Sequence, residues 1–373
     1  MSMAMALAGL LAMTTTGVMA VNCADPVRND AVIQSRLDDA VPRLLAEQRV
    51  PSVAIAHIEN GKIVLAVAYG SQSPGVPATT RTLYNIASMT KPVSAEVELR
   101  LASRGRLSLD EPMYRYWVDP DIATDERRKQ LTPWLALTHQ TGFPNWRRET
   151  GGVLTFERSP GQAYGYSGEG FEYMARFTEK KLGIPFEKLA QTLVFEPIGM
   201  RDTAYTRRSW FAGRIAVPTD REGKALEPAI AERFFASDQL YTTIGDYARF
   251  LLSVMKHEGV NDAIAGERER ILVSRKSGIC TPAMRNDCPT DIGFGLGWEV
   301  LKFGQETVLM HTGMDDGLFT FGYVEPTQGT ATVIFTNSAN GPRVVLPLLD
   351  LLGKDPAFVA FLRRQAGQGQ AAG

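Results

Sequence analysis

The chain of 373 residues is poor in the side chains that bind metal ions or cross-link small proteins. It has only three cysteines and four histidines, and the histidines are far apart and outside any H-E-x-x-H pattern. We therefore predict no metal site and no cofactor. Cys280 and Cys288 are close enough in the sequence to form a short disulfide loop if the chain is exported, and two free thiols are the alternative.

The sequence also lacks an excess of charge of either sign. Its 40 basic residues balance 41 acidic residues, and it contains no run of lysine and arginine. Proteins that bind nucleic acid need a basic surface to neutralise the phosphate backbone. Nucleic acid is therefore not expected as a partner.

Long hydrophobic runs are missing as well. The apolar stretch at residues 3–13 is too short for a membrane-spanning helix, which needs about 20 residues. Small residues follow it near Ala20, so we predict a signal peptide at residues 1–20 and a secreted or periplasmic protein, with no stable membrane insertion after the signal is removed. The positively charged start of such signals is absent, and a buried N-terminal helix is the alternative.

The hydrophobic pattern changes in kind along the chain. Residues 53–69 alternate apolar and polar positions around Asn60-Gly61, a pair that suits a tight hairpin turn. Strand-like runs return at residues 296–300, 307–311, 318–324 and 330–336. Helical periodicity marks residues 88–103, 170–182, 186–194, 247–255 and 344–352.

These segments predict a mixed α/β (α+β) fold, with an antiparallel sheet built from both chain ends and flanked by helices. The folded domain is expected at residues 28–365. Its sheet part comprises residues 28–114 and 231–365, and a mostly helical part at residues 115–230 is inserted into it. The last residues, 366–373, are rich in Gln, Gly and Ala and are expected to be a disordered tail.

Ser88-Met89-Thr90-Lys91 fits the pattern S-x-x-K, which places both side chains on one face of a helix, so that the amine reaches the hydroxyl. The spacing alone is weak, because Ser253 and Lys256 share it. Ser88, however, opens its predicted helix, where free backbone N–H groups favour negative charge. Ser88 is therefore a candidate nucleophile with Lys91 as its base, and a plain N-cap serine is the alternative.

Further blocks follow Ser88 in a fixed order. Seven blocks share this order, namely Asn85 to Lys91, Gly105 to Pro112, Leu137 to Gly142, Pro160 to Gly168, Phe195 to Thr203, Asp238 to Thr243 and His311 to Gly313. Together they resemble the class C beta-lactamase-related serine hydrolases, a family that includes D-alanyl-D-alanine carboxypeptidases, D-aminopeptidases and esterases. The resemblance extends from about residue 50 to the final strand and implies the beta-lactamase/transpeptidase-like fold.

The resemblance implies an acyl-enzyme on Ser88. Lys91 or Tyr166 takes the serine proton, and the sequence leaves open which of the two is the base. Tyr166 can later give a proton to the leaving group. His139 is more consistent with a structural role in the turn before Gly142 than with a catalytic triad.

The last block implies the opposite wall of the substrate cleft. Thr312 and Gly313 are expected to bind substrate along a strand edge, and the backbone N–H groups of Ser88 and Met314 are expected to form the oxyanion hole. Beta-lactamases have a lysine where this chain has His311, so we expect His311 to be catalytic and to give activity a pH-dependent limb near pH 6.5.

One departure from the family concerns the substrate. Gly168, also expected to line the substrate site, stands where beta-lactamases and D,D-peptidases have an asparagine that binds the substrate amide. Its loss favours small carboxylic esters. A D-alanyl-D-alanine carboxypeptidase, a D-aminopeptidase, a beta-lactamase and a non-catalytic muropeptide-binding module remain alternatives, so the partner is a small ester or a D-amino-acid-containing molecule. Asn145 or Asn337 is a candidate replacement for the lost amide, and four aromatic residues are expected as pocket walls, namely Phe143, Trp146, Phe294 and Phe319.

Overall fold

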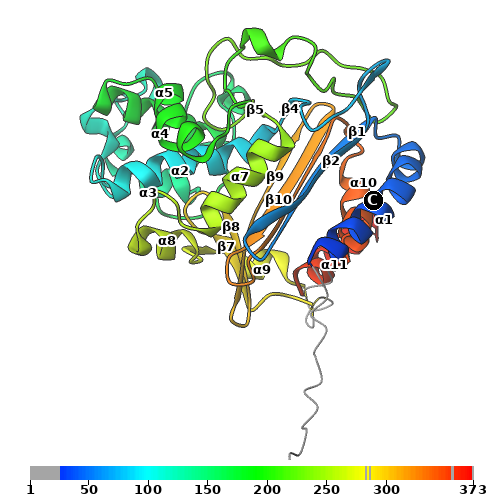
Figure 1. Ribbon diagram of the computed structural model, residues 1–373. Coiled ribbons are helices and arrows are strands. Elements are labelled where there is room, and N and C mark those ends of the chain that lie inside the picture. Colours follow the sequence, from blue (N-terminus) through cyan, green and yellow to red (C-terminus); the bar gives the residue numbers. More distant parts are fainter. Residues whose placement is uncertain (1–25, 282–283, 285–286, 354–356, 372–373) are drawn as a thin grey trace, which may run out of the picture.

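The structure, a computed structural model, describes residues 26–281, 284, 287–353 and 357–371. The predicted signal peptide at residues 1–20 lies outside the described residues. At the centre of the molecule is a nine-stranded sheet (Figure 1). In chain order its strands are β1 (Ser52–Glu59), β2 (Lys62–Ser73), β3 (Val76–Pro77), β6 (Val273–Ser274), β7 (Asp291–Phe294), β8 (Glu299–Phe303), β9 (Glu306–Asp315), β10 (Leu318–Glu325) and β11 (Thr330–Thr336).

The strand order is β3-β2-β1-β11-β10-β9-β8-β7-β6, and every neighbouring pair is antiparallel. The first long hairpin therefore lies beside the last strand, with Val53 opposite Thr336. This arrangement confirms the predicted antiparallel sheet built from both chain ends. A separate two-stranded sheet joins β4 (Tyr84–Asn85) to β5 (Tyr241–Thr242).

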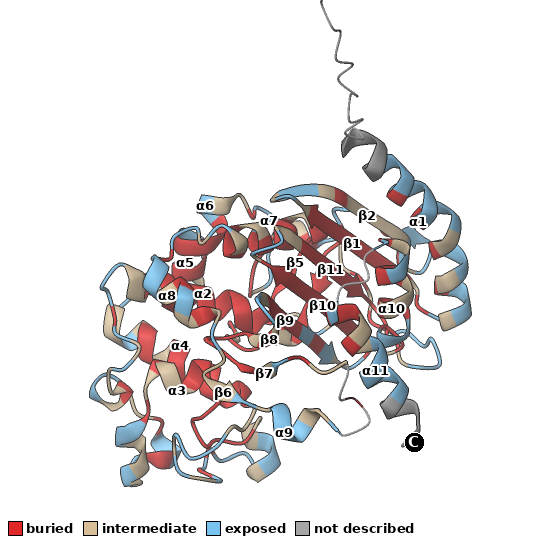
Figure 2. Ribbon diagram, turned by 90° about the horizontal axis from the view of Figure 1, so that it is seen from below, coloured by how far each residue is buried: buried red, intermediate tan, exposed pale blue. Residues whose placement is uncertain are grey.

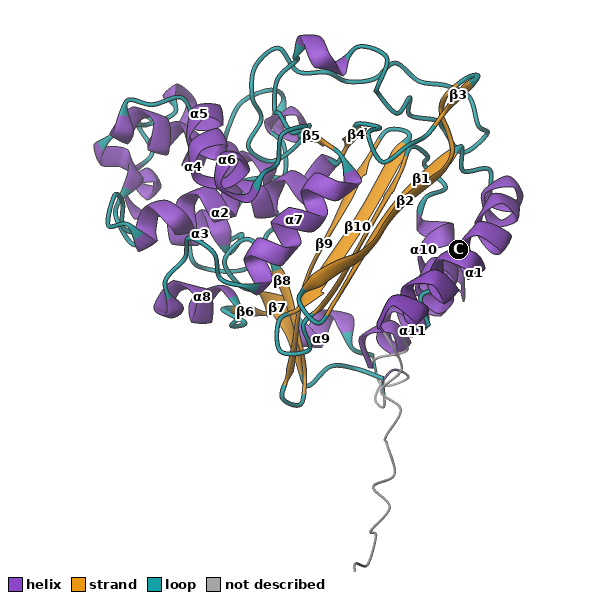
Figure 3. Ribbon diagram, in the orientation of Figure 1, coloured by secondary structure: helices purple, strands orange, loops and turns teal. Residues whose placement is uncertain are grey.

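Helices cover both faces of the large sheet, which is why its central strands β1, β10 and β11 are buried on both sides (Figures 2 and 3). Alternate residues of β1 face opposite cores: Val53 and Ile55 pack toward one cluster of apolar side chains, and Ala54 and Ala56 toward another. The first cluster includes side chains of α1 (Pro26–Gln48), α10 (Pro342–Leu351) and α11 (Ala357–Ala371). The second includes side chains of α2 (Thr90–Ser103) and α7 (Ile244–Met255). Among the described residues, no helix combines the length and the apolar character needed to cross a membrane.

Residues 115–230 form the second part of the molecule (Figure 1). Apolar side chains between residues 122 and 177 pack with Ala95 and Leu99 of α2. The loop near Val217 and Thr219 instead lies at the end of the large sheet, where these residues donate backbone hydrogen bonds to Gln72 and Asn337. The helices of this second part are α3 (Pro133–Leu137), α4 (Gly168–Leu182), α5 (Phe186–Ala190) and α6 (Glu196–Ile198). The expectation of a mostly helical part is therefore too strong, because long loops connect these helices and no α-helix occurs at residues 199–240. Side-chain hydrogen bonds to the backbone stabilise these loops in place of helical bonds, as where Glu187 accepts bonds from Thr206.

Two other expectations differ from the structure. The strand expected at residues 296–300 begins only at Glu299, because residues 295–298 form the turn between β7 and β8, in which Gly297 has a φ of +80°. The tail expected to be disordered from residue 366 continues helix α11 to Ala371. This helix begins with apolar side chains that are buried against the sheet, and it then extends beyond them.

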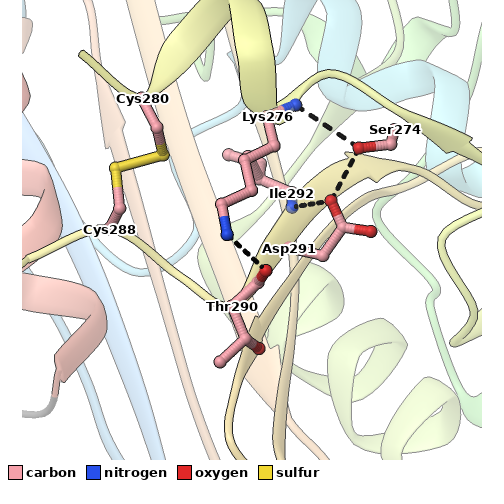
Figure 4. Close-up of a disulfide and its surroundings, with 7 residues drawn as sticks. All are labelled: Ser274, Lys276, Cys280, Cys288, Thr290, Asp291 and Ile292. Atoms are coloured by element: carbon pink, nitrogen blue, oxygen red, sulfur yellow. Dashed lines mark hydrogen bonds between the residues drawn. A yellow bond between two sulfur atoms is a disulfide. The ribbon is translucent and has the colours of Figure 1, made fainter. Parts of the chain in front are cut away.

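The disulfide left open by the sequence is formed in the structure. Cys280 and Cys288 are bonded, with their Cα atoms 6.0 Å apart (Figure 4). Cys280 directly follows the short helix α9 (Lys276–Ile279), and Lys276 Nζ donates to the Thr290 carbonyl at 2.7 Å. The remaining helix of this region, α8 (Asp262–Arg268), lies before β6.

Candidate active site

Ser88 lies at a sharp turn between β4 and α2. The turn is a short 3-10 helix, and Ala87 within it has a φ of +44°, a left-handed conformation that is unfavourable for a residue other than glycine. The Ala87 N–H donates to Asn85 Oδ1 at 2.9 Å. Thr320 Oγ1, on the central strand β10, donates to the Ile86 carbonyl at 2.9 Å. The sheet therefore helps to fix the strained backbone that presents Ser88.

Lys91 lies one helical turn after Ser88 and is completely buried. Its Nζ donates to Ser88 Oγ at 2.9 Å and to the Ser237 carbonyl at 2.9 Å. An ammonium group has three protons to donate, and the centre of the Tyr166 ring lies 4.8 Å from Nζ. The S-x-x-K spacing thus brings a buried amine into direct contact with the serine hydroxyl.

Tyr166 lies in the loop before α4, and two neighbours of this loop fix its position. Ser167 caps α4 by accepting the Gly170 N–H at 3.0 Å, and its hydroxyl donates to the Pro144 carbonyl at 2.7 Å. His139 accepts the Ser167 N–H on Nδ1 at 3.1 Å, and its ring centre lies 4.4 Å from that of Tyr166. Burial, with Lys91 nearby, holds the pKa of His139 well below its usual value. A neutral imidazole packed behind Tyr166 supports the structural role that the sequence suggests.

His311 lies on β9, with its ring centre 6.3 Å from that of Tyr166. Its Nδ1 is 2.7 Å from the Thr312 carbonyl, and because a carbonyl only accepts, Nδ1 carries the proton. Nε2 is therefore an acceptor, and it is buried without a hydrogen-bond partner. Burial, with a smaller contribution from Lys91, lowers the pKa of His311 to about 3. The expected activity limb near pH 6.5 is therefore wrong as a property of His311, because the buried ring stays neutral throughout that range.

The end of β9 forms an open strand edge beside Ser88. Strand β8 pairs with β9 only as far as Met310, so residues 311–315 have no partner on that side. A Cβ atom at Gly313 would lie 2.1 Å from the Ile86 carbonyl oxygen, so only glycine allows β9 to approach the Ser88 turn this closely. Ser88 and Met314 line one cavity, which is the arrangement that an oxyanion hole made of their N–H groups requires.

This cavity has a volume of about 690 Å³. Of the four aromatic residues expected as walls, Trp146 and Phe294 line it. Phe143 and Phe319 do not, because Phe143 is buried among the helices around α4 and Phe319 packs on the face of the sheet covered by α10. The lining consists of Ser88, Asn145, Trp146, Arg148, Tyr164, Tyr166, Phe235, Asp238, Gln239, Arg275, Phe294, Glu299, His311, Thr312, Met314 and Asp315.

Several charged lining residues were missed by sequence reasoning. Asp238 follows Ser237 in a block that carries the family resemblance, so the motif itself could have drawn attention to it. Its pKa is raised to about 6 by burial, against the opposing effect of Lys91. The next residue, Gln239, has a φ of +63°, a second strained non-glycine backbone in the cavity wall. Arg275, stacked over the Tyr164 ring at 4.4 Å, carried no recognisable sequence signal.

The space that an asparagine side chain at position 168 would need is filled by the ring of Trp146. A Cβ atom at Gly168 would lie 2.9 Å from Cη2 of Trp146. The Gly168 N–H donates to Asn145 Oδ1 at 2.9 Å, and Asn145 lines the cavity. Asn337 does not line it, because its amide is bonded to Ser52 and to the Val217 carbonyl. Of the two candidate replacements, only Asn145 is in place.

The fold and the site define a serine hydrolase of the beta-lactamase-related type. The sequence profile of the beta-lactamase family matches residues 37–353. The D-alanyl-D-alanine-carboxypeptidase/endopeptidase AmpH of Escherichia coli K12 is 23% identical over 350 residues, which are 85% of this chain and 88% of that protein. Esterase EstB of Burkholderia gladioli is 28% identical over 221 residues, 50% of this chain and 55% of EstB.

A solved structure of a penicillin-binding protein homologue has a similar fold. The octameric penicillin-binding protein homologue from Pyrococcus abyssi superimposes with a TM-score of 0.70 and 21% identity, over 87% of this chain and 78% of that chain. A beta-lactamase from Escherichia coli K12 is 24% identical over 289 residues, 72% of each chain. The chain therefore belongs to the beta-lactamase family.

Proposed function

We propose that the protein hydrolyses small carboxylic esters through an acyl-enzyme on Ser88. The observation that supports this most directly is the 2.9 Å contact between the buried Lys91 amine and Ser88 Oγ at the wall of the cavity. A serine hydroxyl needs such a base, because it is a weak nucleophile when protonated.

The proposed reaction has two steps. Ser88 Oγ attacks the ester carbonyl carbon while its proton passes to Lys91 or Tyr166, and the carbonyl oxygen becomes an oxyanion near the N–H groups of Ser88 and Met314. The tetrahedral intermediate then collapses, and the leaving alkoxide takes a proton, for which Tyr166 is the candidate donor. Water repeats the sequence on the acyl-enzyme and releases the acid.

His311 has a different part in this scheme from the one a lysine would have. A lysine at this place would put a positive charge near the Tyr166 phenol. The neutral His311 instead offers the lone pair of Nε2, which can only accept a hydrogen bond. We infer that His311 assists by accepting a hydrogen bond from the Tyr166 hydroxyl during the reaction, a bond that is not formed in the present structure, and that its role does not depend on its charge.

The preference for esters rests on the wall around Gly168. An enzyme that selects amides needs a polar partner for the substrate N–H and C=O groups, and the aromatic ring of Trp146 fills the space of a side chain at position 168. The relative EstB is named an esterase. A D-alanyl-peptide hydrolase is the second candidate, favoured by the Asn145 amide at the cavity wall and by the relative AmpH.

We further propose that the protein acts outside the cytoplasm. Residues 1–20 have the composition of a signal peptide, and the Cys280–Cys288 disulfide suits an oxidising compartment. A non-reducing mass measurement of the secreted or periplasmic fraction would detect the processed, disulfide-bonded chain.

The decisive experiment is labelling with a fluorophosphonate, read by intact-protein mass spectrometry, for wild type and Ser88→Ala. The same proteins are assayed with p-nitrophenyl acetate, a D-alanyl-D-alanine dipeptide and nitrocefin. We expect one label on wild type, none on Ser88→Ala, and ester turnover well above that of the other substrates. If the dipeptide is the better substrate, the protein is a D-alanyl-peptide hydrolase. If nitrocefin is the better substrate, it is a beta-lactamase. If the wild-type protein takes up no label, the remaining candidate is a non-catalytic muropeptide-binding module.

A further inference from the structure

Glu172 is a half-buried carboxylate on α4 that none of the catalytic steps above uses. Its Oε1 accepts two hydrogen bonds from one residue, the Ser237 N–H at 3.0 Å and the Ser237 hydroxyl at 2.6 Å. Burial raises the pKa of the Glu172 carboxyl, and the hydrogen bonds from Ser237 oppose this shift. Glu172 therefore holds both the backbone and the side chain of Ser237.

Ser237 in turn contacts the catalytic amine. Its carbonyl accepts one of the two hydrogen bonds of Lys91 Nζ, at 2.9 Å, and the other bond goes to Ser88 Oγ. The segment before β5 that contains Ser237 is neither helix nor strand, so its own backbone pairing does not fix the carbonyl. Beside Glu172, two side chains of α2 anchor it: Ser94 Oγ donates to the Ala236 carbonyl at 2.6 Å, and Thr90 Oγ1 accepts the Leu240 N–H at 3.2 Å.

We propose that Glu172 is a positioning residue for catalysis. It fixes Ser237 so that the Ser237 carbonyl directs the Lys91 amine at Ser88 Oγ. A general base must lie within hydrogen-bond reach of the proton it removes, and a displacement of about 1 Å can cost on the order of a hundredfold in rate. Because this role presupposes the hydrolase activity proposed above, its test needs one readout that does not depend on turnover.

The chain contains a matched control. Glu187, on α5, holds a loop in the same way: it accepts the N–H groups of Tyr205 and Thr206 at 3.1 and 3.2 Å, and the Thr206 hydroxyl at 2.8 Å. Within the described part of the chain, neither of these two loop residues is hydrogen-bonded to Lys91 or to Ser237, although the Tyr205 hydroxyl is bonded to Ser94 at 2.9 Å. Removing either carboxylate thus frees a loop, but only Glu172→Ala frees the carbonyl that contacts the catalytic amine.

The experiment compares Glu172→Ala, Glu172→Gln and Glu187→Ala with wild type, using p-nitrophenyl acetate turnover, the fluorophosphonate labelling rate and thermal unfolding. For Glu172→Ala we expect kcat and the labelling rate to fall about 10- to 100-fold, with KM changed less than about twofold, because the substrate does not contact Glu172. Glu172→Gln should recover part of the loss, since its amide oxygen still accepts from Ser237. Glu187→Ala should lower the unfolding temperature without this loss of kcat.

Crystal structures of the two alanine variants provide the readout that is independent of turnover. We expect the distance from Lys91 Nζ to Ser88 Oγ to lengthen beyond hydrogen-bond reach in Glu172→Ala and to stay near the present 2.9 Å in Glu187→Ala. An unchanged distance in Glu172→Ala, or equal losses of kcat in the two alanine variants, would overturn the positioning role. An inactive, unlabelled wild type would refute the hydrolase function, while the distances would still decide whether Glu172 positions Lys91.

Discussion

The most informative single residue near the cavity is Gly168, which is buried behind the cavity wall, because the expected side chain is missing there and Trp146 occupies its space. The ring of Trp146 lies where a Cβ atom at position 168 would be, and Lys91 Nζ lies 5.9 Å from the centre of that ring. The guanidinium of Arg148 lies on the same ring at 5.5 Å. An aromatic ring near Lys91 and Arg148 therefore occupies the position where the family resemblance leads us to expect an asparagine amide.

Restoring asparagine at this position therefore should not restore the relatives' specificity. In Gly168→Asn the new Cβ atom would lie only 2.9 Å from Cη2 of Trp146, which is too close for two carbon atoms that are not bonded. Overpacking of this kind typically costs about 1–3 kcal/mol of folding stability. We expect a lower unfolding temperature and at least a tenfold lower kcat/KM for p-nitrophenyl acetate. In the double variant Gly168→Asn, Trp146→Ala, the space is free, and the ratio of nitrocefin to ester turnover should rise.

The control for this prediction is Trp146→Ala alone, which opens the wall without supplying an amide. It should keep ester turnover and gain none with nitrocefin. If Gly168→Asn were as stable and active as wild type, the tryptophan would be a mobile side chain and not a fixed wall.

Where a motif carries the candidate site residues, the sequence predicted which of them lie together. Ser88 and Lys91 follow from helical spacing, and Tyr166 and His311 from their blocks, so all four could be predicted to meet. The charge state of His311 could not be predicted from the sequence, because it depends on how completely the surrounding side chains bury the ring. Phe143 and Phe319 show a second limit, since neighbours of a motif residue in sequence often point into the core instead of the cavity.

At the scale of elements, helix α2 determines how the site is built. The sequence predicts one apolar face, with Val93, Val97 and Leu101, and those residues do pack toward the sheet and α7. The opposite face is buried as well, because Ala95 and Leu99 belong to the core around α3 and α4. Because α2 is buried on all sides, its charged residues lie in the interior. An amphipathic pattern with a single apolar face predicts instead that they are exposed to solvent.

Glu98 on this helix provides a pH-dependent test. Burial raises its pKa from 4.5 to about 8, and Thr178 Oγ1 donates to it at 2.7 Å. Between these pH values the folded protein keeps a proton that the unfolded chain releases, so the free energy of unfolding falls as pH rises from 4.5 to 8. Glu98→Gln has no such proton to lose. We expect it to be more stable than wild type at pH 8, by at most about 5 kcal/mol at about 1.4 kcal/mol per pKa unit, and nearly equal at pH 4.5.

Urea unfolding of both proteins at pH 5 and at pH 8 measures this difference. Glu96→Gln is the matched control on the same helix, because Glu96 is equally buried but paired with Arg268 at 2.7 Å. Removing the charge of Glu96 takes away the nearer and fully buried counter-ion of Arg268 and leaves only Glu269, at 3.4 Å, so that variant should be less stable than wild type at both pH values. Glu98→Gln losing stability at pH 8 would show that Glu98 is ionised in the folded protein.

At the scale of the whole molecule, the central feature is a sheet that joins the two chain ends. The hairpin at residues 53–69 and the last three strands could be predicted from alternation and from the Asn60-Gly61 turn. Helix α1 before β1 is not among the helices that the hydrophobic periodicity predicts. Yet α1, α10 and α11 together cover one face of the sheet (Figure 1), so both ends of the chain are needed to complete the core.

Two truncations at the C-terminal end test this view of the fold. A chain that stops at Gly353 loses helix α11, whose Phe358, Val359 and Phe361 are buried against the sheet and α10. Burying each such side chain contributes roughly 1.5–3 kcal/mol, so the loss is comparable to the total stability of many domains, about 5–15 kcal/mol. We expect this protein to be insoluble or to unfold at a much lower temperature.

A chain that stops at Arg364 keeps all three buried side chains and loses only residues after them, of which 365–367 are exposed. Its unfolding temperature should stay within a few degrees of that of the full chain, because surface residues away from special contacts contribute little. If the shorter chain does not fold at all, Phe358→Ala in the full chain gives the same information, with an expected cost of about 3–5 kcal/mol. Equal stability of all these proteins would mean that α11 is not part of the core, and that the sheet is closed on that face by α1 and α10 alone.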